Sequence, residues 1–355
     1  MKTVAKILIC YNSPVSLFTN YNGKPAVDDS VPNDLSESGF SREINKIKKY
    51  LQENFTEVAS FAINNNIDRT INKIVSYSPD VIFNFVESID GVASYEYCMA
   101  GLFEMLGFDF TGNLPASLGN CLNKAKAKTI LSSFGINTPA SMIIKLEQSE
   151  KFDSGNFHLN FPVILKLLNE DASIGISELS VVKNFESLNN HIRFLHSNFK
   201  QDVLVEEYID GRELNIAVLG HKTLPISEIK FDGLPKGLPK IVTYDGKWIA
   251  DSVYYENTKP SCPAKLDPDL RSSIEKTALL AFNAMECRDY ARVDIRLDKK
   301  NIPFVIEVNP NPDISMDSGF ARAAAAADIS YSNLLFTISG FALARKEYDT
   351  KIKAG

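Results

Sequence analysis

Polar and apolar side chains alternate in two neighbouring segments near the C-terminal end of the chain, residues 291–298 and 304–309. A period of two residues is typical of half-buried strands, and the polar turn 298–301 between the segments predicts a hairpin. The polar positions are Arg292, Asp294 and Arg296 on the first strand, and Glu307 and Asn309 on the second. Pro-Asn-Pro follows Asn309, so the second strand is expected to end there.

This hairpin is a candidate metal site, because both predicted strands turn polar side chains toward one face. Asp294, Glu307 and Asn309 supply hard oxygen ligands, and Arg292 lies beside them. Such oxygens suit Mg²⁺, which proteins usually hold through one or two carboxylates together with substrate phosphates. The alternative is a sheet with a solvated polar face. The position of Asn309 at a strand end favours the metal site.

The first third of the chain alternates short apolar runs with amphipathic segments, which predicts strands and helices in turn. The predicted strands are 6–10, 58–62 and 80–85, and the predicted helices are 39–53, 68–76 and 95–106. This order is typical of an open, parallel α/β sheet, and we assign residues 1–122 to an N-terminal domain. No Gly-x-Gly-x-x-Gly follows a strand, which disfavours an NAD-dependent enzyme. The long polar loop 12–38 is expected to be functional or mobile.

Two further units follow, a small central α+β domain at 123–210 and a C-terminal α+β domain at 211–355. The central unit has predicted helices at 124–134 and 186–198, and predicted strands at 141–145, 163–166 and 203–208. The C-terminal unit has predicted strands at 213–219 and 226–229, a Gly/Pro-rich loop at 232–239, a helix at 269–285, the hairpin, and one last helix at 320–343. The predicted fold class is therefore α/β with three domains.

Length and charge narrow the functional classes. A chain of 355 residues is too long for one ordinary core. A formal net charge of −6 gives no electrostatic support for binding nucleic acid. No apolar stretch approaches the roughly 18 residues of a membrane span. The cysteines are scattered, with no Cys-x-x-Cys, and the histidines have no metal-ligand spacing, so we expect a cytoplasmic protein with reduced thiols.

A lysine at the end of an apolar strand is a candidate phosphate ligand. Lys166 ends the run Phe-Pro-Val-Ile-Leu-Lys, and the small-residue loop 171–177 follows it closely. An ammonium group and the backbone N–H groups of such a loop suit phosphate oxygens. The segment is not a Walker loop, because Gly-Lys-Ser/Thr is absent. A strand-end lysine alone is usually structural or solvated, and Lys124 at a helix start is equally unremarkable in isolation.

The segment Val205–Asn215 enters an acidic stretch from an apolar strand, turns at Asp-Gly and resumes as a strand. Backbone groups at such a strand end can pair with an adenine edge. A carboxylate such as Glu213 can accept hydrogen bonds from both ribose hydroxyls. The alternative is a plain connection with solvated acids.

Together these segments resemble the ATP-grasp superfamily, specifically its D-alanine–D-alanine ligase branch. The resemblance covers nearly the whole chain. It rests on the order Lys124, Lys166 with its loop, Glu206-Glu207-Tyr208-Ile209 with Glu213, Arg292-Val-Asp294, and Glu307-Val-Asn309-Pro-Asn-Pro. The first domain shares it through Ile89-Asp-Gly91, the segment 100–112 and Leu122-Asn-Lys124.

The resemblance implies a role for each position. Lys124 and Lys166 would bind the ATP phosphates, and Ser173 and its neighbours would form the loop that closes over them. Glu206, Glu207 and the backbone through Ile209 would meet adenine, and Glu213 would meet the ribose. Asp294, Glu307 and Asn309 would hold two Mg²⁺ ions, for which Mn²⁺ could substitute, and Arg292 would stabilise phosphoryl and oxyanion charge.

In this family a carboxylate attacks the γ-phosphate of ATP, and an amine then displaces phosphate from the acyl phosphate. Water has to be kept out, and the loops 171–177 and 232–259 are the expected lids. The resemblance also implies amino-acid or small-peptide substrates and homodimerisation. The charge and the apolar pattern predict no nucleic-acid or membrane partner.

Several positions depart from the D-alanine–D-alanine ligase pattern. The first serine of the glycine-rich loop is Ala172. Counting back from Cys262-Pro-Ala, Ser252 and Val253 fall where the family has a lysine-tyrosine pair. Asp313 replaces the glycine after Asn-x-x-Pro and would lie beside the second amino acid.

Two further substrate positions can be assigned by the same resemblance. Ser318 falls where the family has a serine for the acceptor carboxylate. The glutamate that binds the first amino group has no clean match, and Glu37 is the best candidate.

The sequence thus predicts an ATP-dependent carboxylate–amine ligase that is not a cell-wall D-alanine–D-alanine ligase. Asp313 favours a basic or amine-rich acceptor. Three alternatives remain: a D-alanine–D-alanine ligase, a non-catalytic ATP-binding regulatory module, and a ligase that modifies a peptide or protein terminus.

Overall fold

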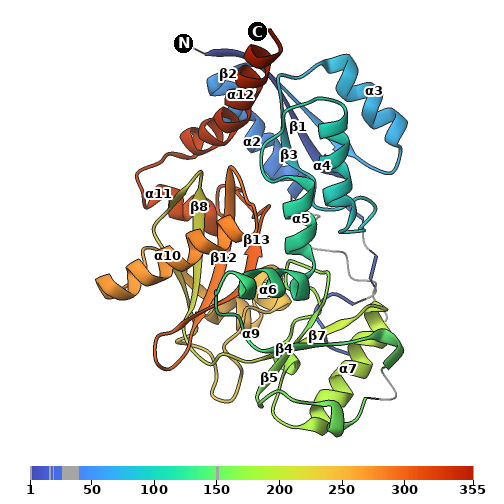
Figure 1. The fold of residues 1–355 in the computed structure, drawn as a ribbon, viewed down its shortest axis with the longest axis vertical. Coiled ribbons are helices and arrows are strands. Elements are labelled where there is room, and N and C mark those ends of the chain that lie inside the picture. Colours follow the sequence, from blue (N-terminus) through green and yellow to red (C-terminus); the bar gives the residue numbers. More distant parts are fainter. Residues whose placement is uncertain (1, 16, 19, 26–39, 149–151, 355) are drawn as a thin grey trace.

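The structure is a computed structural model that describes residues 2–15, 17–18, 20–25, 40–148 and 152–354. It contains three separate sheets, which occupy the N-terminal, central and C-terminal parts of the chain (Figure 1). The predicted α/β class agrees with this structure, in which the first sheet is parallel and the other two are antiparallel. We refer to the predicted domains 1–122, 123–210 and 211–355 as the N-terminal, central and C-terminal units.

The N-terminal sheet is parallel, as predicted, in the order β2-β1-β3. Its elements are β1 (Thr3–Asn12), α2 (Phe40–Asn54), β2 (Phe55–Ile63), α3 (Ile67–Tyr77), β3 (Val81–Phe85), α4 (Tyr95–Met105) and α5 (Pro115–Leu122). Ile7 and Ile9 of β1 pack into one core and Leu8 and Cys10 into another, since both faces of the sheet are covered. This double burial explains why β1 has a continuous apolar run. The helix α5 was not predicted.

The central unit holds an antiparallel sheet in the order β4-β7-β5-β6, and its apolar core is formed largely by that sheet and α7. Its elements are α6 (Lys124–Ser133), β4 (Ser141–Ile144), η1 (Leu146–Gln148), η2 (Ser154–Asn156), β5 (Val163–Leu167), η3 (Glu178–Ser180), β6 (Val181–Val182), α7 (Phe185–Phe199) and β7 (Val203–Glu207). Leu188, Ile192 and Leu195 form the apolar face of α7 at helical spacing, and all three are buried.

The C-terminal unit is built on a sheet in the order β11-β10-β8-β12-β13, with β9 paired to β8. Its elements are β8 (Glu213–Leu219), β9 (Lys222–Thr223), β10 (Ser227–Lys230), α8 (Tyr244–Trp248), α9 (Val253–Asn257), β11 (Lys259–Ser261), α10 (Pro268–Ala284), β12 (Tyr290–Leu297), β13 (Pro303–Asn309), α11 (Gly319–Ala325) and α12 (Tyr331–Ala354). Helix α10 covers one face of this sheet and shares its core with α6. The predicted hairpin is confirmed as β12 and β13.

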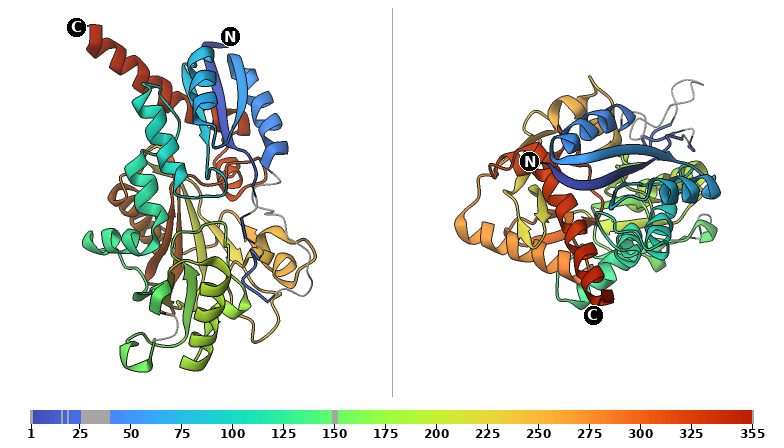
Figure 2. Two further views of the ribbon diagram at one scale, coloured as in Figure 1. Left: turned by 90° about the vertical axis from the view of Figure 1, so that its right-hand side faces the viewer. Right: turned by 90° about the horizontal axis from the view of Figure 1, so that it is seen from above.

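The single last helix predicted at 320–343 is wrong. The chain forms α11 and α12 instead, separated at Asp328, where φ is +59°. A left-handed residue ends a right-handed helix, and nothing in the apolar run of the sequence signals it. The end of α12 projects beyond the rest of the fold (Figure 2).

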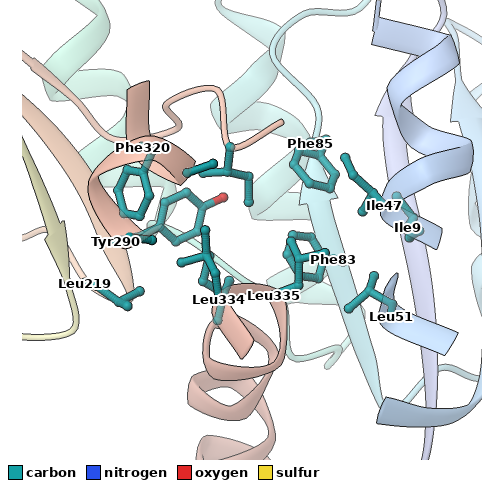
Figure 3. Close-up of a cluster of buried hydrophobic side chains, with 14 of the residues drawn as sticks. Ile9, Ile47, Leu51, Phe83, Phe85, Leu219, Tyr290, Phe320, Leu334 and Leu335 are labelled. Atoms are coloured by element: carbon teal, nitrogen blue, oxygen red, sulfur yellow. The ribbon is translucent and has the colours of Figure 1, made fainter. Parts of the chain in front are cut away.

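Helix α12 joins the two ends of the chain in one core. Leu334 and Leu335 of α12 lie among Phe83 of the N-terminal sheet and Tyr290 and Phe320 of the C-terminal unit (Figure 3). The first and last units therefore share buried apolar surface, whereas the central sheet has its own core with α7. Among the described residues, no helix is both long and apolar enough to cross a membrane.

Candidate functional site

A cavity of about 1010 Å³ lies where the three units meet. It is lined by every predicted site residue that the structure describes: Lys124, Lys166, Ser173, Glu206, Glu207, Ile209, Glu213, Arg292, Asp294, Glu307, Asn309, Asp313 and Ser318. Glu37, the predicted ligand of the first amino group, lies outside the described residues. Positions that are almost 200 residues apart in sequence thus open into one space.

The wall of the cavity on the C-terminal sheet carries a row of polar side chains across three strands. Asp294 of β12 is paired directly with Glu307 of β13 on one side and with Asn215 of β8 on the other. Arg292 is paired with Asn309 in the same way. Directly paired residues project to the same face of a sheet. The polar side chains of the two hairpin strands therefore share one face, as their alternation predicted.

Arg292 and Asn215 both donate hydrogen bonds to the carboxylate of Asp294. The Nε and Nη2 atoms of Arg292 each donate to one carboxylate oxygen at 2.8 Å, and Asn215 Nδ2 donates to Oδ1 at 2.8 Å. Burial alone would lower the pKa of Arg292, but Asp294 outweighs it and the pKa is raised. The two side chains therefore form one rigid, charge-compensated unit.

The donor atoms on this wall suit a hard divalent cation. Among the described residues, no three His, Cys, Asp or Glu side chains converge as a complete metal site. Asp294 and Glu307 instead offer two directly paired carboxylates, with the carboxamide of Asn309 beside them. Two carboxylates that leave the other positions to substrate phosphates are the usual protein share of a Mg²⁺ site. These side chains therefore fit the ion that the sequence suggested.

Lys124 reaches into the cavity from the start of α6. Its Nζ donates to the carbonyl of Glu170, lies 3.1 Å from Asp171 Oδ1, and lies 3.8 Å from Glu307 Oε1. Burial alone would lower the pKa of this ammonium, but Asp171 and Glu307 outweigh it and raise the pKa. Lys124 therefore remains charged and connects the predicted loop with the predicted metal site.

Lys166 enters the cavity from β5 and is held by Glu206 of β7. The ion pair has an N–O distance of 2.9 Å, and a second ammonium, that of Lys128, lies 2.8 Å from the other oxygen of Glu206. Burial alone would raise the pKa of Glu206, but the two lysines outweigh it and lower the pKa to about 2. The Glu206 side chain thus orients Lys166. This differs from the adenine contact expected for it.

The end of β7 forms the side of the cavity that the sequence assigned to a base. Glu207 accepts hydrogen bonds from the backbone N and Nδ2 of Asn160, at 2.8 and 2.7 Å, and Tyr208 N donates to the carbonyl of Pro162 at 2.9 Å. The side chain of Glu207 therefore fastens the strand end. Tyr208 and Ile209, which follow Glu207, also line this part of the cavity.

Glu213, the predicted ribose ligand, is paired with an arginine that the sequence analysis left without a role. Arg296 Nη1 donates to Glu213 Oε2 at 3.0 Å, and Nη2 donates to the carbonyl of Lys240 at 2.8 Å. Its guanidinium also lies 4.9 Å from the centre of the Tyr208 ring. Burial raises the pKa of Glu213 despite Arg296. Arg296 therefore connects β8, β12 and the 232–243 loop beside the cavity.

The predicted closing loop at 171–177 is held in an uncommon conformation. Ala172 and Ser173 both have positive φ, +54° and +63°. Such values are unfavourable for residues with a side chain, so contacts elsewhere have to maintain them. One such contact is a hydrogen bond of 3.1 Å from Ser173 Oγ to the carbonyl of Val242.

A lysine-aromatic pair also lies over the cavity, at Lys247-Trp248 of α8. Trp248 Nε1 donates to the carbonyl of Ala172 at 3.1 Å, so α8 and the closing loop are connected. Burial, with Arg292 nearby, lowers the pKa of Lys247. Counting back from Cys262 gave Ser252 and Val253 for this pair, but neither of these residues is among those that line the cavity.

The local structure explains why Ser252 and Val253 lie away from the cavity. Ser252 caps α9 by accepting from Tyr255 N at 3.1 Å, and Val253 is half exposed. Helix α9 and strand β11 lie between α8 and Cys262, and neither was predicted.

A segment of the N-terminal unit completes the cover. Lys24 forms ion pairs with Glu178 at 2.9 Å and with Asp245 at 2.7 Å, and the Tyr21 and Tyr244 rings are stacked with centres 5.9 Å apart. All three units therefore contribute to one lid. The loop 12–38, which was predicted to be functional, is described up to residue 25, and its end at Tyr21 and Lys24 belongs to this lid.

The predicted acceptor positions lie on the loop that precedes α11. Asp313 accepts from Ser315 N at 2.8 Å, and burial raises the pKa of its carboxyl. Ser318 lines the cavity, but its hydroxyl accepts from Ala321 N at 3.1 Å and caps α11. Ser318 therefore has a structural role at this position.

Comparison with known proteins places the chain in a family. The sequence model described as D-ala D-ala ligase C-terminus matches residues 130–339. A D-alanine–D-alanine ligase of Nitrosospira multiformis is 30% identical over 242 residues, which are 68% of this chain and 74% of that protein. A Sinorhizobium fredii protein named uncharacterized protein y4sG is 34% identical over 255 residues, 72% of each chain.

Solved structures give the same result for the fold. The crystal structure of D-alanine–D-alanine ligase from Bacillus anthracis complexed with ATP has a TM-score of 0.71 at 23% identity. The match covers 98% of this chain and 100% of that chain. The family resemblance of the sequence is thus confirmed. The chain belongs to the D-alanine–D-alanine ligase family and has the ATP-grasp fold of these ATP-dependent, amide-forming ligases.

Proposed function

We propose that this protein is an ATP-dependent ligase that joins the carboxylate of one amino acid or small peptide to an amine through an acyl phosphate. The supporting observation is the convergence of two lysines, two paired carboxylates and an arginine on one covered cavity. Lys124 and Lys166 come from the central unit, and Arg292, Asp294 and Glu307 come from the C-terminal sheet. A chain that only bound nucleotide would not need the arginine and the carboxylates in one row.

In this proposal ATP lies between the central and C-terminal sheets. The end of β7 near Ile209 meets the adenine edge, and Glu213 accepts from the ribose. Lys166, oriented by Glu206, and Lys124 bind the phosphates, where their charge offsets that of the phosphoryl oxygens. Mg²⁺, held by Asp294, Glu307 and Asn309, would neutralise charge on the phosphates.

In this proposal Arg292 acts on the reacting carboxyl group. Its guanidinium is already fixed by two hydrogen bonds to Asp294, so little reorganisation is needed when an oxyanion forms nearby. Lys247 and Trp248 of α8, together with the 171–177 loop, cover the cavity and would exclude water from the acyl phosphate.

The substrate pair is proposed to differ from two D-alanines. Ala172 lacks the hydroxyl expected in the closing loop, and Asp313 adds a carboxylate to the acceptor side of the cavity. Asp317 on the same loop raises the pKa of Asp313 further, which indicates that the two carboxylates influence each other. We infer an acceptor with a basic or amine-rich group.

The test is a pairwise screen of D- and L-amino acids and basic amines, with ADP release and product mass as readouts. We expect turnover that needs both partners, with a basic acceptor preferred at least about tenfold. Asp313→Asn should remove about 1.4 kcal/mol or more of that preference, the equivalent of tenfold. Selective turnover of D-alanine alone would instead make the protein a D-alanine–D-alanine ligase. No ADP release with any pair would leave nucleotide binding as its role and contradict the proposal.

A further inference from the structure

Glu96 is a buried carboxylate in the wall of the cavity, and the reaction outlined above does not use it. It lies in the first turn of α4, is 7% exposed, and lines the cavity from the N-terminal unit. In the sequence it is one acid within a predicted helix, with no motif around it. The contacts that distinguish it exist only in the folded chain.

Glu96 lies close to the predicted metal ligands. Asn311 Nδ2 donates to Glu96 Oε1 at 3.0 Å, and the backbone N of Asn311 donates to Asn309 Oδ1 at 2.9 Å. Asn311 also donates to the carbonyl of Val86 at 3.3 Å and accepts from the Tyr290 hydroxyl at 3.3 Å. The Glu96 carboxylate is thereby held at a fixed place one side chain away from Asn309.

No cation of the described chain pairs with this carboxylate, and within that part of the chain only Asn311 donates a hydrogen bond to it. The charged groups that act on it are the carboxylates of Asp171, from the closing loop, and Glu87, from the segment after β3. Its other titratable neighbours are Tyr290 of β12 and Cys121 of α5. Burial, with these two carboxylates, raises the pKa of Glu96 well above its ordinary value.

A buried carboxylate without a cationic partner is costly unless a ligand supplies the missing charge. Its raised pKa also makes it a stronger base than an ordinary carboxylate. In the proposed reaction the amine enters the cavity as an ammonium ion. It has to lose a proton before its nitrogen can attack. Both needs are met by the same carboxylate.

We propose that Glu96 binds the ammonium group of the acceptor amine and accepts its proton. This inference rests on the proposed ligase function. The proton moves from R–NH₃⁺ to the carboxylate, which gives a neutral amine and a carboxylic acid. The nitrogen lone pair then attacks the acyl carbon and forms the C–N bond. The C–O bond to phosphate breaks, phosphate leaves with that electron pair, and the remaining extra proton of the nitrogen goes to phosphate.

A purely structural role for Glu96 would be to connect the N-terminal and C-terminal units through Asn311. Glu96→Gln separates the two roles, because the amide oxygen still accepts from Asn311 but cannot take a proton. Glu96→Asp retains a carboxylate at a shorter reach. Glu104→Gln on the exposed face of the same helix is the matched control.

The experiment measures two products with the donor that gives most ADP release in the screen. One product is the hydroxamate formed with hydroxylamine, which is uncharged at neutral pH and needs no base. The other is the amide formed with the selected amine. For Glu96→Gln we expect hydroxamate formation within about twofold of wild type, and amide formation reduced about 100-fold at neutral pH, the usual contribution of a general base.

The pH profile adds a second readout. In Glu96→Gln the residual amide formation should rise about tenfold for each pH unit, because it depends on free amine already in solution. In wild type, Glu104→Gln and the partly active Glu96→Asp, amide formation should instead level off once the carboxylate at position 96 is deprotonated. Equal loss of hydroxamate and amide would show a structural role and overturn the inference, as would an unchanged amide rate. Wild type that forms neither product contradicts the proposed function itself.

Discussion

Glu206 illustrates how one side chain determines the position of another. It is 1% exposed, and its two oxygens each face an ammonium, those of Lys128 and Lys166. Lys128 is itself fastened to the carbonyl of Pro139 at 3.2 Å. Lys166 is therefore the member of the trio that remains available to the cavity. The orientation of Lys166 is therefore set by the buried carboxylate of Glu206.

Glu206→Gln should destabilise the protein and weaken ATP binding together. Removing one partner of a buried ion pair leaves uncompensated charge, which costs about 3–5 kcal/mol. Urea unfolding measures the loss, and ATP titration should show a Kd raised at least about tenfold. Glu186→Gln, exposed on α7, should change the free energy of unfolding by about 0.5 kcal/mol or less. Unchanged stability in Glu206→Gln would contradict the buried trio.

Asp294→Asn tests the paired carboxylates. The variant keeps the shape of the side chain but leaves the Arg292 guanidinium without its bidentate partner and removes one oxygen charge from the proposed Mg²⁺ site. We expect Mg²⁺-dependent ADP release to fall at least about 100-fold, with the far-ultraviolet circular dichroism spectrum unchanged. Full activity would refute the metal assignment.

Individual residues were predictable from the sequence where a motif surrounded them. Asp294 and Glu307 stand in alternating strands, and Lys166 ends an apolar run, so pattern and chemistry agreed. Lys247 and Glu96 had no such context. Lys247 required the correct count across α9, and Glu96 required Asn311, which is distant in sequence and close only in the fold.

At the scale of elements, α8 and the 171–177 loop behave as one cover. Besides the Trp248 hydrogen bond, Tyr244 N donates to the carbonyl of Ile176 at 3.0 Å. Neither short helix of the 232–259 segment was predicted, although the segment was expected to be a lid. Its five-residue helices are too short for a clear amphipathic period, whereas the long β12–β13 alternation was unmistakable.

Trp248→Phe should loosen this cover, because a smaller aromatic ring remains and the donor to the Ala172 carbonyl is lost. We expect a KM for ATP raised about fivefold, roughly the value of one neutral hydrogen bond, and more ATP hydrolysis without ligation. The ratio of ADP to amide product measures the second effect. Trp248 is also the one tryptophan of the chain, so its fluorescence should change when ATP binds. A constant product ratio would show that the contact does not exclude water.

Helix α7 carries a pH-sensitive contact beneath the central sheet. His191 is buried, its Nε2 lies 3.4 Å from Ser180 Oγ, and burial lowers its pKa from 6.5 to about 4. A group whose pKa is lowered by folding contributes stability above its unfolded pKa. That stability is lost as the pH falls through the folded value.

The stability of the central unit should therefore decline between about pH 6.5 and pH 4, by about 3 kcal/mol in full. His191→Gln should flatten this part of the curve, as measured by urea unfolding at several pH values. His221→Gln, at a histidine without a comparable burial, serves as the control. A variant that retains the wild-type slope would show that another group is responsible.

At the scale of the whole molecule, the two ends of the chain form one cooperative body. Leu335 is fully buried between the N-terminal sheet and the C-terminal unit, in the cluster that holds Phe83 and Tyr290. The sequence predicted three units, but nothing in it indicated that α12 packs back against the sheet of the first one. That packing depends on tertiary complementarity, which an apolar helix face alone does not specify.

Leu335→Ala should lower the free energy of unfolding by about 2–5 kcal/mol. Hydrogen exchange followed by mass spectrometry should show faster exchange in β1, β3 and β8 together, with β5 and β7 of the central unit unchanged. Leu188→Ala, equally buried but in the central core, should give the reverse pattern. Faster exchange confined to α12 would show that the ends are separate bodies.

The seal between the N-terminal segment and the closing loop depends on two residues without side chains. A Cβ atom built on Gly23 would lie 2.2 Å from the carbonyl oxygen of Gly175, and φ at Gly23 is +70°. The side chain of any other residue at position 23 would clash with the backbone of Gly175 and push the two backbones apart. It would keep the cavity open at the place where Gly175 N donates a hydrogen bond to the carbonyl of Tyr21 at 2.8 Å. The activity of Gly23→Ala therefore measures how closely the N-terminal segment and the closing loop have to pack during turnover.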